Sequence, residues 1–168
     1  QMVIPQPGMI RSEVEAAYVR AASEDEREKI VAAYHEQTNP HDGKQLLNKP
    51  WFESEAGHVE ILEGVQHKYP QTQLVFDKTT QNCFAFCTYC FRWAQFAGID
   101  GLKFMNKRPQ DLAEYLDRHP EVTDVLYTGG DPLTMSTRLI RRYVAPLLDR
   151  KREGLSTIRF GSKALAYW

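Results

Sequence analysis

The first apolar positions of the chain recur at the spacing of an α-helix. They lie between Arg11 and Gln37 and comprise Val14, Tyr18, Ile30, Val31 and Tyr34. Charged residues fill most of the remaining positions, which is typical of a face turned to solvent. The pattern predicts a helical region that Ser12 or Ser23 can cap and that the turn-forming residues 39–43 close.

Residues 44–65 lack a strong period and predict a loop-rich connection with room for one short helix. Strand patterns follow at Thr72–Phe76, Val122–Thr128 and Ser156–Phe160. Each is a short apolar run bounded by turn residues. The sequence therefore predicts three strands in the second half of the chain.

Two helix patterns separate these strands. Residues 106–109 open the first, which places Leu112, Ala113 and Leu116 on one face and stops at Pro120. Ser136 or Thr137 opens the second, and Gly154 marks its end. The apolar positions of the second helix are Leu139, Ile140, Tyr143, Val144, Leu147 and Leu148.

The alternation of strand and helix indicates parallel βαβ units. We expect an α/β fold, with a helical accessory region at 1–65 and the N-terminal half of a partial parallel (β/α) barrel at 66–168. Three strands are too few for a barrel, which usually has about eight. The chain also stops at Trp168, directly after the third strand pattern. A piece of a longer protein is therefore expected.

Composition narrows the class of protein but suggests no chemistry. Hydrophobic residues make up 42% of the 168 residues, charged residues 26%, and the net charge is -1. These values are typical of a soluble globular protein and give no electrostatic reason to expect nucleic acid or an acidic membrane as partner. No run approaches the roughly 20 apolar residues that span a bilayer. Without a signal-peptide pattern, a cytoplasmic location is predicted.

All three cysteines of the chain fall within eight residues. Cys83, Cys87 and Cys90 form the spacing CxxxCxxC, which predicts a metal site instead of a disulfide framework. Three thiolates can hold an iron–sulfur cluster and leave one iron open to a ligand such as the amine and carboxylate of S-adenosylmethionine (SAM). The alternative is zinc, with His67 or His119 as fourth ligand, although zinc sites usually pair cysteines as CxxC.

The residues around the motif resemble the radical SAM superfamily, and within it the lysine 2,3-aminomutase family. Tyr89 stands at the aromatic position before the third cysteine, and residues 91–98 read Phe-Arg-Trp-Ala-Gln-Phe-Ala-Gly, with the arginine and the final Phe-Ala-Gly of the family. Residues 64–70 resemble the family's approach to the first strand. The resemblance implies a [4Fe–4S] cluster, bound SAM, and a 5′-deoxyadenosyl radical that takes hydrogen from an amino acid such as lysine, for 2,3-amino migration.

A glycine-rich turn, Thr128-Gly129-Gly130-Asp131, follows the second predicted strand. Loops after parallel strands emerge at the same edge of a sheet, so we expect this turn to neighbour the cysteines. Asp131 and Pro132 can also start a helix, as cap and first residue. In the family this turn resembles the element that receives the SAM amino group.

Further site residues come from the resemblance. Arg92 matches an arginine that holds the substrate carboxylate, a role that suits the bidentate guanidinium. At the end of the third strand, Arg159, Ser162 and Lys163 resemble a family pattern whose residues would point toward the cofactor.

The sequence departs from the family before the cysteines. The family has an arginine for the phosphate of pyridoxal phosphate after Tyr-Pro, whereas Gln71 and Thr72 follow here, and two extra residues precede Cys83. Pyridoxal phosphate is therefore an optional cofactor. A radical SAM reaction without it, or a non-catalytic iron–sulfur or zinc module, is the alternative, and the fragment alone is expected to be inactive as an aminomutase.

The resemblance also sets the expected partners. They are an amino-acid substrate and an electron donor such as flavodoxin or ferredoxin, with a homo-oligomer as an option and neither nucleic acid nor membrane.

Overall fold

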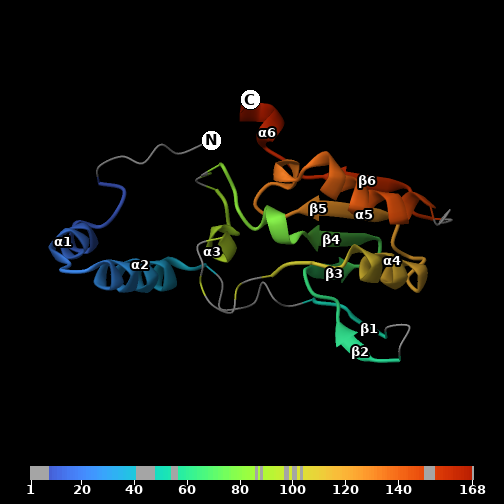
Figure 1. The fold of residues 1–168 in the computed structure, drawn as a ribbon, viewed down its shortest axis with the longest axis horizontal. Coiled ribbons are helices and arrows are strands. Elements are labelled where there is room, and N and C mark those ends of the chain that lie inside the picture. Colours follow the sequence, from blue (N-terminus) through green and yellow to red (C-terminus); the bar gives the residue numbers. More distant parts are fainter. Residues whose placement is uncertain are drawn as a thin grey trace. The chain divides into compact units, whose positions relative to one another are not determined.

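A computed structural model describes residues 8–40, 48–53, 57–85, 87, 89–96, 99, 102, 104–149 and 154–167. The chain forms two compact units (Figure 1). The first comprises Gln1–Gln45 and Ala85–Lys103, and the second comprises Leu46–Phe84 and Phe104–Trp168. The predicted boundary at residue 65 differs from this division, because residues 85–103 group with the N-terminal helices.

The first unit is helical. Its elements are α1 (Ser12–Arg20), α2 (Glu24–Thr38) and the short α3 (Trp93–Phe96). The predicted helical region is confirmed, but it divides between α1 and α2. Ser23 caps α2, because its hydroxyl accepts a hydrogen bond from the Glu26 amide at 3.2 Å. Ser12 lies inside α1 and does not cap it.

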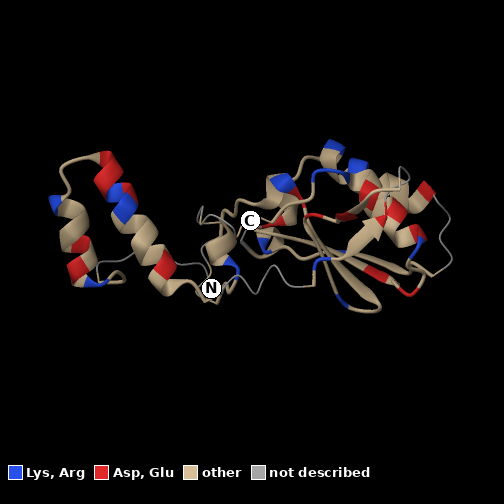
Figure 2. Cartoon of the chain, turned by 90° about the horizontal axis from the view of Figure 1, so that it is seen from below, with Lys and Arg blue, Asp and Glu red and all other residues tan. Residues whose placement is uncertain are grey.

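Charged residues of both signs interleave along α1 and α2 (Figure 2). None of the residues of these two helices is buried. The acidic residues of α2 gather in its first turn, where they face the positive end of the helix dipole. Among the described residues, no helix has both the length and the apolar character needed to cross a membrane.

The second unit begins with a hairpin that the sequence did not predict. Strands β1 (Trp51–Glu53) and β2 (Val59–Ile61) pair antiparallel within the segment expected to be loop. Strand β3 (Val65–Tyr69) then pairs antiparallel with β4 (Thr72–Phe76). The expectation of a loop-rich connection at 44–65 is therefore wrong for β1 and β2.

The three predicted strands are confirmed as a parallel set. Strands β4, β5 (Asp124–Thr128) and β6 (Thr157–Phe160) lie side by side in the order β3-β4-β5-β6. The crossovers carry α4 (Pro109–Asp117) and α5 (Thr137–Asp149), as predicted. Short helices η2 (Lys78–Thr80), η3 (Pro132–Thr134) and α6 (Ala164–Tyr167) follow the strands. The α/β class is confirmed, while the wider barrel stays a prediction.

The core lies between the sheet and the helices α4 and α5. Leu112 and Leu116 of α4 and Tyr143 of α5 pack with buried residues of the sheet. The sheet contributes Val65, Val75, Val125 and Tyr127. Leu148 was expected on the apolar face of α5, but 64% of its surface is exposed. This arrangement leaves the turns after β4, β5 and β6 at one edge of the unit.

Candidate cofactor-binding site

The segment that leads to Cys83 lies against the glycine turn. We call Thr80–Asn82 the approach segment and Thr128–Asp131 the glycine turn. Phe76, the last residue of β4, pairs with Thr128, the last residue of β5. The Gly130 amide donates to the Thr80 carbonyl at 2.6 Å. The segment that leads to Cys83 and the glycine turn are therefore in direct contact, while the placement of Cys87 and Cys90 beside the turn stays a prediction.

Both glycines of the turn are required by this contact. A Cβ atom on Gly129 would lie 2.3 Å from the Thr80 hydroxyl oxygen, and one on Gly130 would lie 2.2 Å from the Asn82 carbonyl oxygen. Gly129 also has a φ of 141°, which side-chain-bearing residues rarely adopt. The absence of side chains lets the approach segment pack directly on the backbone of the turn.

A buried polar network holds the chain just before the approach segment. Asp77 is 3% exposed, and its carboxylate accepts hydrogen bonds from the Thr79 amide at 2.7 Å and the Tyr143 hydroxyl at 2.6 Å. The Tyr143 hydroxyl also lies 3.1 Å from two oxygens of Asn106. Burial, and then the neighbouring Asp77 carboxylate, raises the pKa of Tyr143, so its hydroxyl stays protonated as a donor.

Asp131 joins the glycine turn to the end of β6. Its carboxylate is 1% exposed and accepts from the Leu133 amide at 2.9 Å, as the predicted helix cap. It also accepts from the Ser162 hydroxyl at 2.8 Å and the Lys163 amide at 2.8 Å. The structure thus brings together the predicted residues Asp131, Ser162 and Lys163, and the side chain of Asp131 serves this junction.

Arg159 is placed on the sheet, away from that edge. Its Nε donates to Asp124 Oδ1 at 2.8 Å, and its terminal nitrogen also contacts this carboxylate. Asp124 is the first residue of β5, whereas the glycine turn follows the last. The guanidinium therefore faces the start of the strands, and its predicted contact with a cofactor stays untested.

Cys87, Tyr89, Cys90 and Arg92 belong to the first unit. The Cys90 amide donates to the Cys87 carbonyl at 3.0 Å, which closes a turn with a cysteine at each end. Tyr89 is 54% exposed. Arg92 donates to the Gln95 side chain at 3.3 Å. Burial lowers the pKa of Arg92 to about 10, opposed by the charge of Cys90, so the guanidinium stays cationic near neutral pH.

The donor set fits an iron–sulfur cluster. All three cysteines are half-buried, so their thiols can reach a ligand, and thiolates are the usual ligands of such clusters. Cys83 belongs to the second unit and Cys87 and Cys90 to the first, so neither unit alone fixes the distances among them. Within the described part of the chain, no three metal-ligating side chains are already gathered into a site.

The histidines considered for zinc are engaged elsewhere. His67 Nδ1 lies 2.7 Å from the Tyr115 hydroxyl, and His67 Nε2 lies 3.1 Å from the Pro70 carbonyl oxygen. His119 Nδ1 lies 2.8 Å from Glu121, and the two histidine rings are 5.7 Å apart. This group lies beside the first residues of β4, whereas Cys83 follows the last. The arrangement does not favour either histidine as a fourth ligand.

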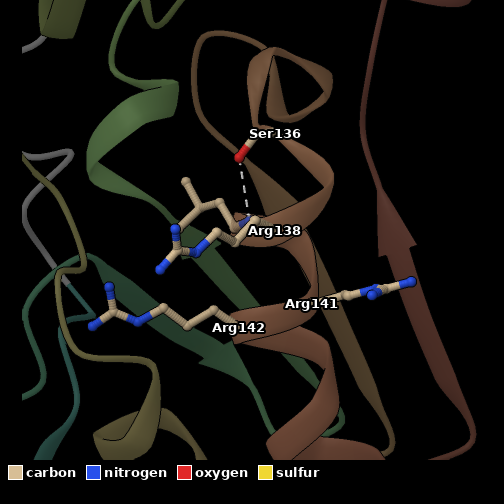
Figure 3. A pocket seen from close by; sticks show the side chains of 5 residues that line it. Ser136, Arg138, Arg141 and Arg142 are labelled. Atoms are coloured by element: carbon tan, nitrogen blue, oxygen red, sulfur yellow. Dashed lines mark hydrogen bonds between the residues drawn. The ribbon is translucent and has the colours of Figure 1, made fainter.

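A separate pocket lies on the outer side of α5 (Figure 3). Arg138 and Arg142 extend to one side of the helix and Arg141 to the other, and the capping residue Ser136 lies at the start of the helix. It shares no residue with the predicted site, and we assign it no role there.

Sequence reasoning missed the residues that organise the edge of the sheet. Thr80, Asp77, Asn106 and Tyr143 were not proposed as parts of the site. Asp77 carried a signal, because a carboxylate directly after a buried strand often meets a buried donor. Thr80 carried none, because its role depends on contact with a turn 48 residues away.

The chain was compared with known proteins. It is 35% identical over 113 residues to a putative L-lysine 2,3-aminomutase of Aquifex aeolicus, a match that covers 67% of this chain and 28% of that protein. With the L-lysine 2,3-aminomutase of Bacillus subtilis it shares 31% over 124 residues, 74% of this chain and 25% of the relative. The relative from Fusobacterium nucleatum, also an L-lysine 2,3-aminomutase, is 31% identical over 123 residues.

The resemblance proposed from the cysteine motif is therefore confirmed by relatives of that name. No protein-family model matches the chain. The chain spans between 25% and 28% of the length of these relatives. The activity of the whole protein is accordingly a matter of proposal.

Proposed function

We propose that this chain, a homologue of the L-lysine 2,3-aminomutases over about two thirds of its length, binds a [4Fe–4S] cluster and SAM as a radical SAM enzyme. One observation carries the proposal. The chain that leads to Cys83 leaves the end of β4 and lies on the glycine turn that leaves the end of the adjacent β5. The segment that leads to the proposed ligand Cys83 and the glycine turn thus share one edge of a parallel sheet, where α/β proteins bind ligands.

Each part of the chain has a role in this proposal. Cys83, Cys87 and Cys90 would hold the cluster, and its iron without a cysteine ligand would bind the amino and carboxylate groups of SAM. The carbonyl groups of the glycine turn accept hydrogen bonds from the SAM amino group. When bound, the cluster and SAM supply one-electron chemistry that generates a 5′-deoxyadenosyl radical. The half-buried cation of Arg92 suits a substrate carboxylate.

The reaction is proposed from similarity alone. The relatives are named L-lysine 2,3-aminomutases, so an amino acid is the proposed substrate and 2,3-amino migration the proposed outcome. Pyridoxal phosphate belongs to this proposal as an optional cofactor. Gln71 and Thr72 stand where the family has an arginine that binds the phosphate of pyridoxal phosphate. This difference favours a reaction that does not use pyridoxal phosphate.

The first prediction concerns the metal. Anaerobic reconstitution of the chain should incorporate about four irons and four sulfides, because three thiolates and an open iron complete a cubane cluster. Replacing Cys83, Cys87 or Cys90 with alanine should abolish incorporation, since the chain has no other thiol. The check is iron, sulfide and zinc analysis of all four proteins.

A matched control uses His67→Gln, which removes a candidate zinc ligand and leaves the thiols in place. It should retain the iron content of the parent chain. Stoichiometric zinc in the parent chain, lost in His67→Gln or in a matching His119 variant, would contradict the proposal and support the zinc module.

A further inference from the structure

Thr80 is buried between two carbonyl groups at the edge of the sheet. It is fully buried, and its hydroxyl oxygen lies 2.8 Å from the Asp77 carbonyl oxygen and 3.2 Å from the Thr128 carbonyl oxygen. Its single proton therefore serves a carbonyl of its own loop and one of the glycine turn. In addition, its own carbonyl accepts the hydrogen bond from Gly130.

Between the sheet residue Thr128 and the anchored Asp131, the backbone of Gly129 and Gly130 is held by this contact with the approach segment. Two consecutive glycines have more conformational freedom than any other pair, and ordering them costs correspondingly more entropy. The Thr80 side chain occupies the space where a Cβ of Gly129 would stand, and Asn82 does the same for Gly130. The approach segment therefore holds the backbone of the turn in one conformation before any ligand binds.

The same contact sets the position of the first cysteine. Cys83 follows the approach segment directly, and its upstream side is held by Asp77, whose carboxylate accepts the Tyr143 hydrogen bond. A displacement at Thr80 would therefore change the distance between a thiol and the turn. Binding elements that are fixed in advance bind more tightly, because less freedom is lost on binding.

We infer that Thr80 is a positioning residue for SAM: it locks the glycine turn onto the segment that carries Cys83, so that the cluster ligand and the turn keep a fixed spacing. The inference rests on the proposed function. It assigns Thr80 no contact with SAM, and it locates a determinant of SAM affinity within the second unit.

The test is Thr80→Val, which keeps the branched shape and removes the proton shared by the two carbonyl groups. The anaerobically reconstituted full chain should stay folded and keep its iron content, while its Kd for SAM rises roughly three- to tenfold, the equivalent of one net hydrogen bond. Thr80→Ser retains the hydroxyl and should restore the parent Kd.

Thr134→Val is the matched control. Thr134 also donates its hydroxyl to a carbonyl three residues earlier, that of Asp131, at 2.7 Å, and this hydrogen bond stays within its own loop, whereas the Thr80 hydroxyl also reaches the Thr128 carbonyl of another loop. Its Kd for SAM should equal that of the parent. Equal weakening in Thr80→Val and Thr134→Val would overturn the inference, because the effect would then be general to the loop.

The remaining outcomes of the experiment also test the inference and the proposed function. A parent chain that takes up iron but binds no SAM contradicts the proposed function and removes the inference with it. If Thr80→Val binds SAM as tightly as the parent, the inference about Thr80 is overturned, while the proposed function is unaffected. If Thr80→Val fails to fold, Gly130→Ala provides the second test, because its Cβ would displace the Asn82 carbonyl. Parent-like SAM binding in a folded Gly130→Ala, or loss of folding in both variants, would refute a role specific to SAM.

Discussion

At the scale of single residues, Tyr143 has a polar role in addition to its place on the apolar face of α5. Its ring packs in the core, while its hydroxyl reaches Asp77 and Asn106. A buried carboxylate without a donor is costly, so this hydroxyl stabilises the chain at the end of β4. We expect Tyr143→Phe to lower the free energy of unfolding by about 1–3 kcal/mol, because it leaves the Asp77 oxygen unpaired.

The pH dependence of this effect has a defined sign. The pKa of Tyr143 is raised in the folded protein by burial and by the Asp77 carboxylate. The unfolded state therefore loses the tyrosine proton first, at about pH 10. The stability that Tyr143 confers is fully present below that pH and declines as the pH rises above it.

Denaturant unfolding of the parent and Tyr143→Phe between about pH 8 and pH 11 measures this difference. The pKa values of Tyr115 and Tyr127 are also raised by burial. Both residues are present in both proteins, so their contributions cancel in the difference. A difference in unfolding free energy that stays constant over the whole range would show that the Tyr143 hydroxyl is not buried against Asp77.

Sequence could indicate candidate ligand residues but not the residues that pack around them. The cysteine spacing and the glycine pair are local patterns, so they were recognisable. The network of Asp77, Asn106 and Tyr143 joins residues up to 66 positions apart, and no local pattern records which tyrosine meets which carboxylate. Thr80 and Asp131 acquire their roles in the same way, through the packing of consecutive βα units.

At the scale of elements, the hydrophobic period and the helix-capping residues predicted most of the strands and helices in the second half of the chain. The apolar run of β4, the proline that begins α4 and the serine before α5 each had a recognisable signal. Strand β3 was missed because Gln66, His67 and Lys68 make it mostly polar. Strands β1 and β2 were missed because three residues are too few to show a period.

The N-terminus of α2 gives a prediction at this scale. Ser23 accepts from the Glu26 amide, and Glu26 in turn accepts from the amide of Ala22, the residue before the cap, at 2.8 Å, an arrangement that resembles a capping box shifted by one donor. Ser23→Ala should destabilise α2 by about 1 kcal/mol. Faster hydrogen exchange of the first-turn amides of α2 would report this loss.

Ser12→Ala is the control for this prediction, because Ser12 lies inside α1 and does not cap it. Exchange in the first turn of α1 should match that of the parent. If both substitutions accelerate hydrogen exchange in their own helices, or if neither does, the assignment of Ser23 as a cap and Ser12 as a non-capping residue is wrong.

At the scale of the whole molecule, the sequence predicted the parallel strands and the contact between their loops, but not how the chain divides. Residues 85–103 group with the N-terminal helices, and the ring of Trp93 in α3 lies 5.6 Å from that of His35 in α2. Such a contact between distant segments leaves no period in the sequence. The predicted accessory region at 1–65 is continuous in sequence. The first unit of the structure instead combines two separate segments that pack together.

The proposed cluster, held by the three cysteines with one iron open to SAM, can be observed directly. The most direct measurement is the electron paramagnetic resonance spectrum of the reduced, reconstituted chain with and without SAM whose amino nitrogen is 15N. We predict a spectrum that changes on addition of SAM and shows coupling to the labelled nitrogen, because an open iron binds that amine. A reduced-cluster spectrum that is identical with and without SAM would contradict the account.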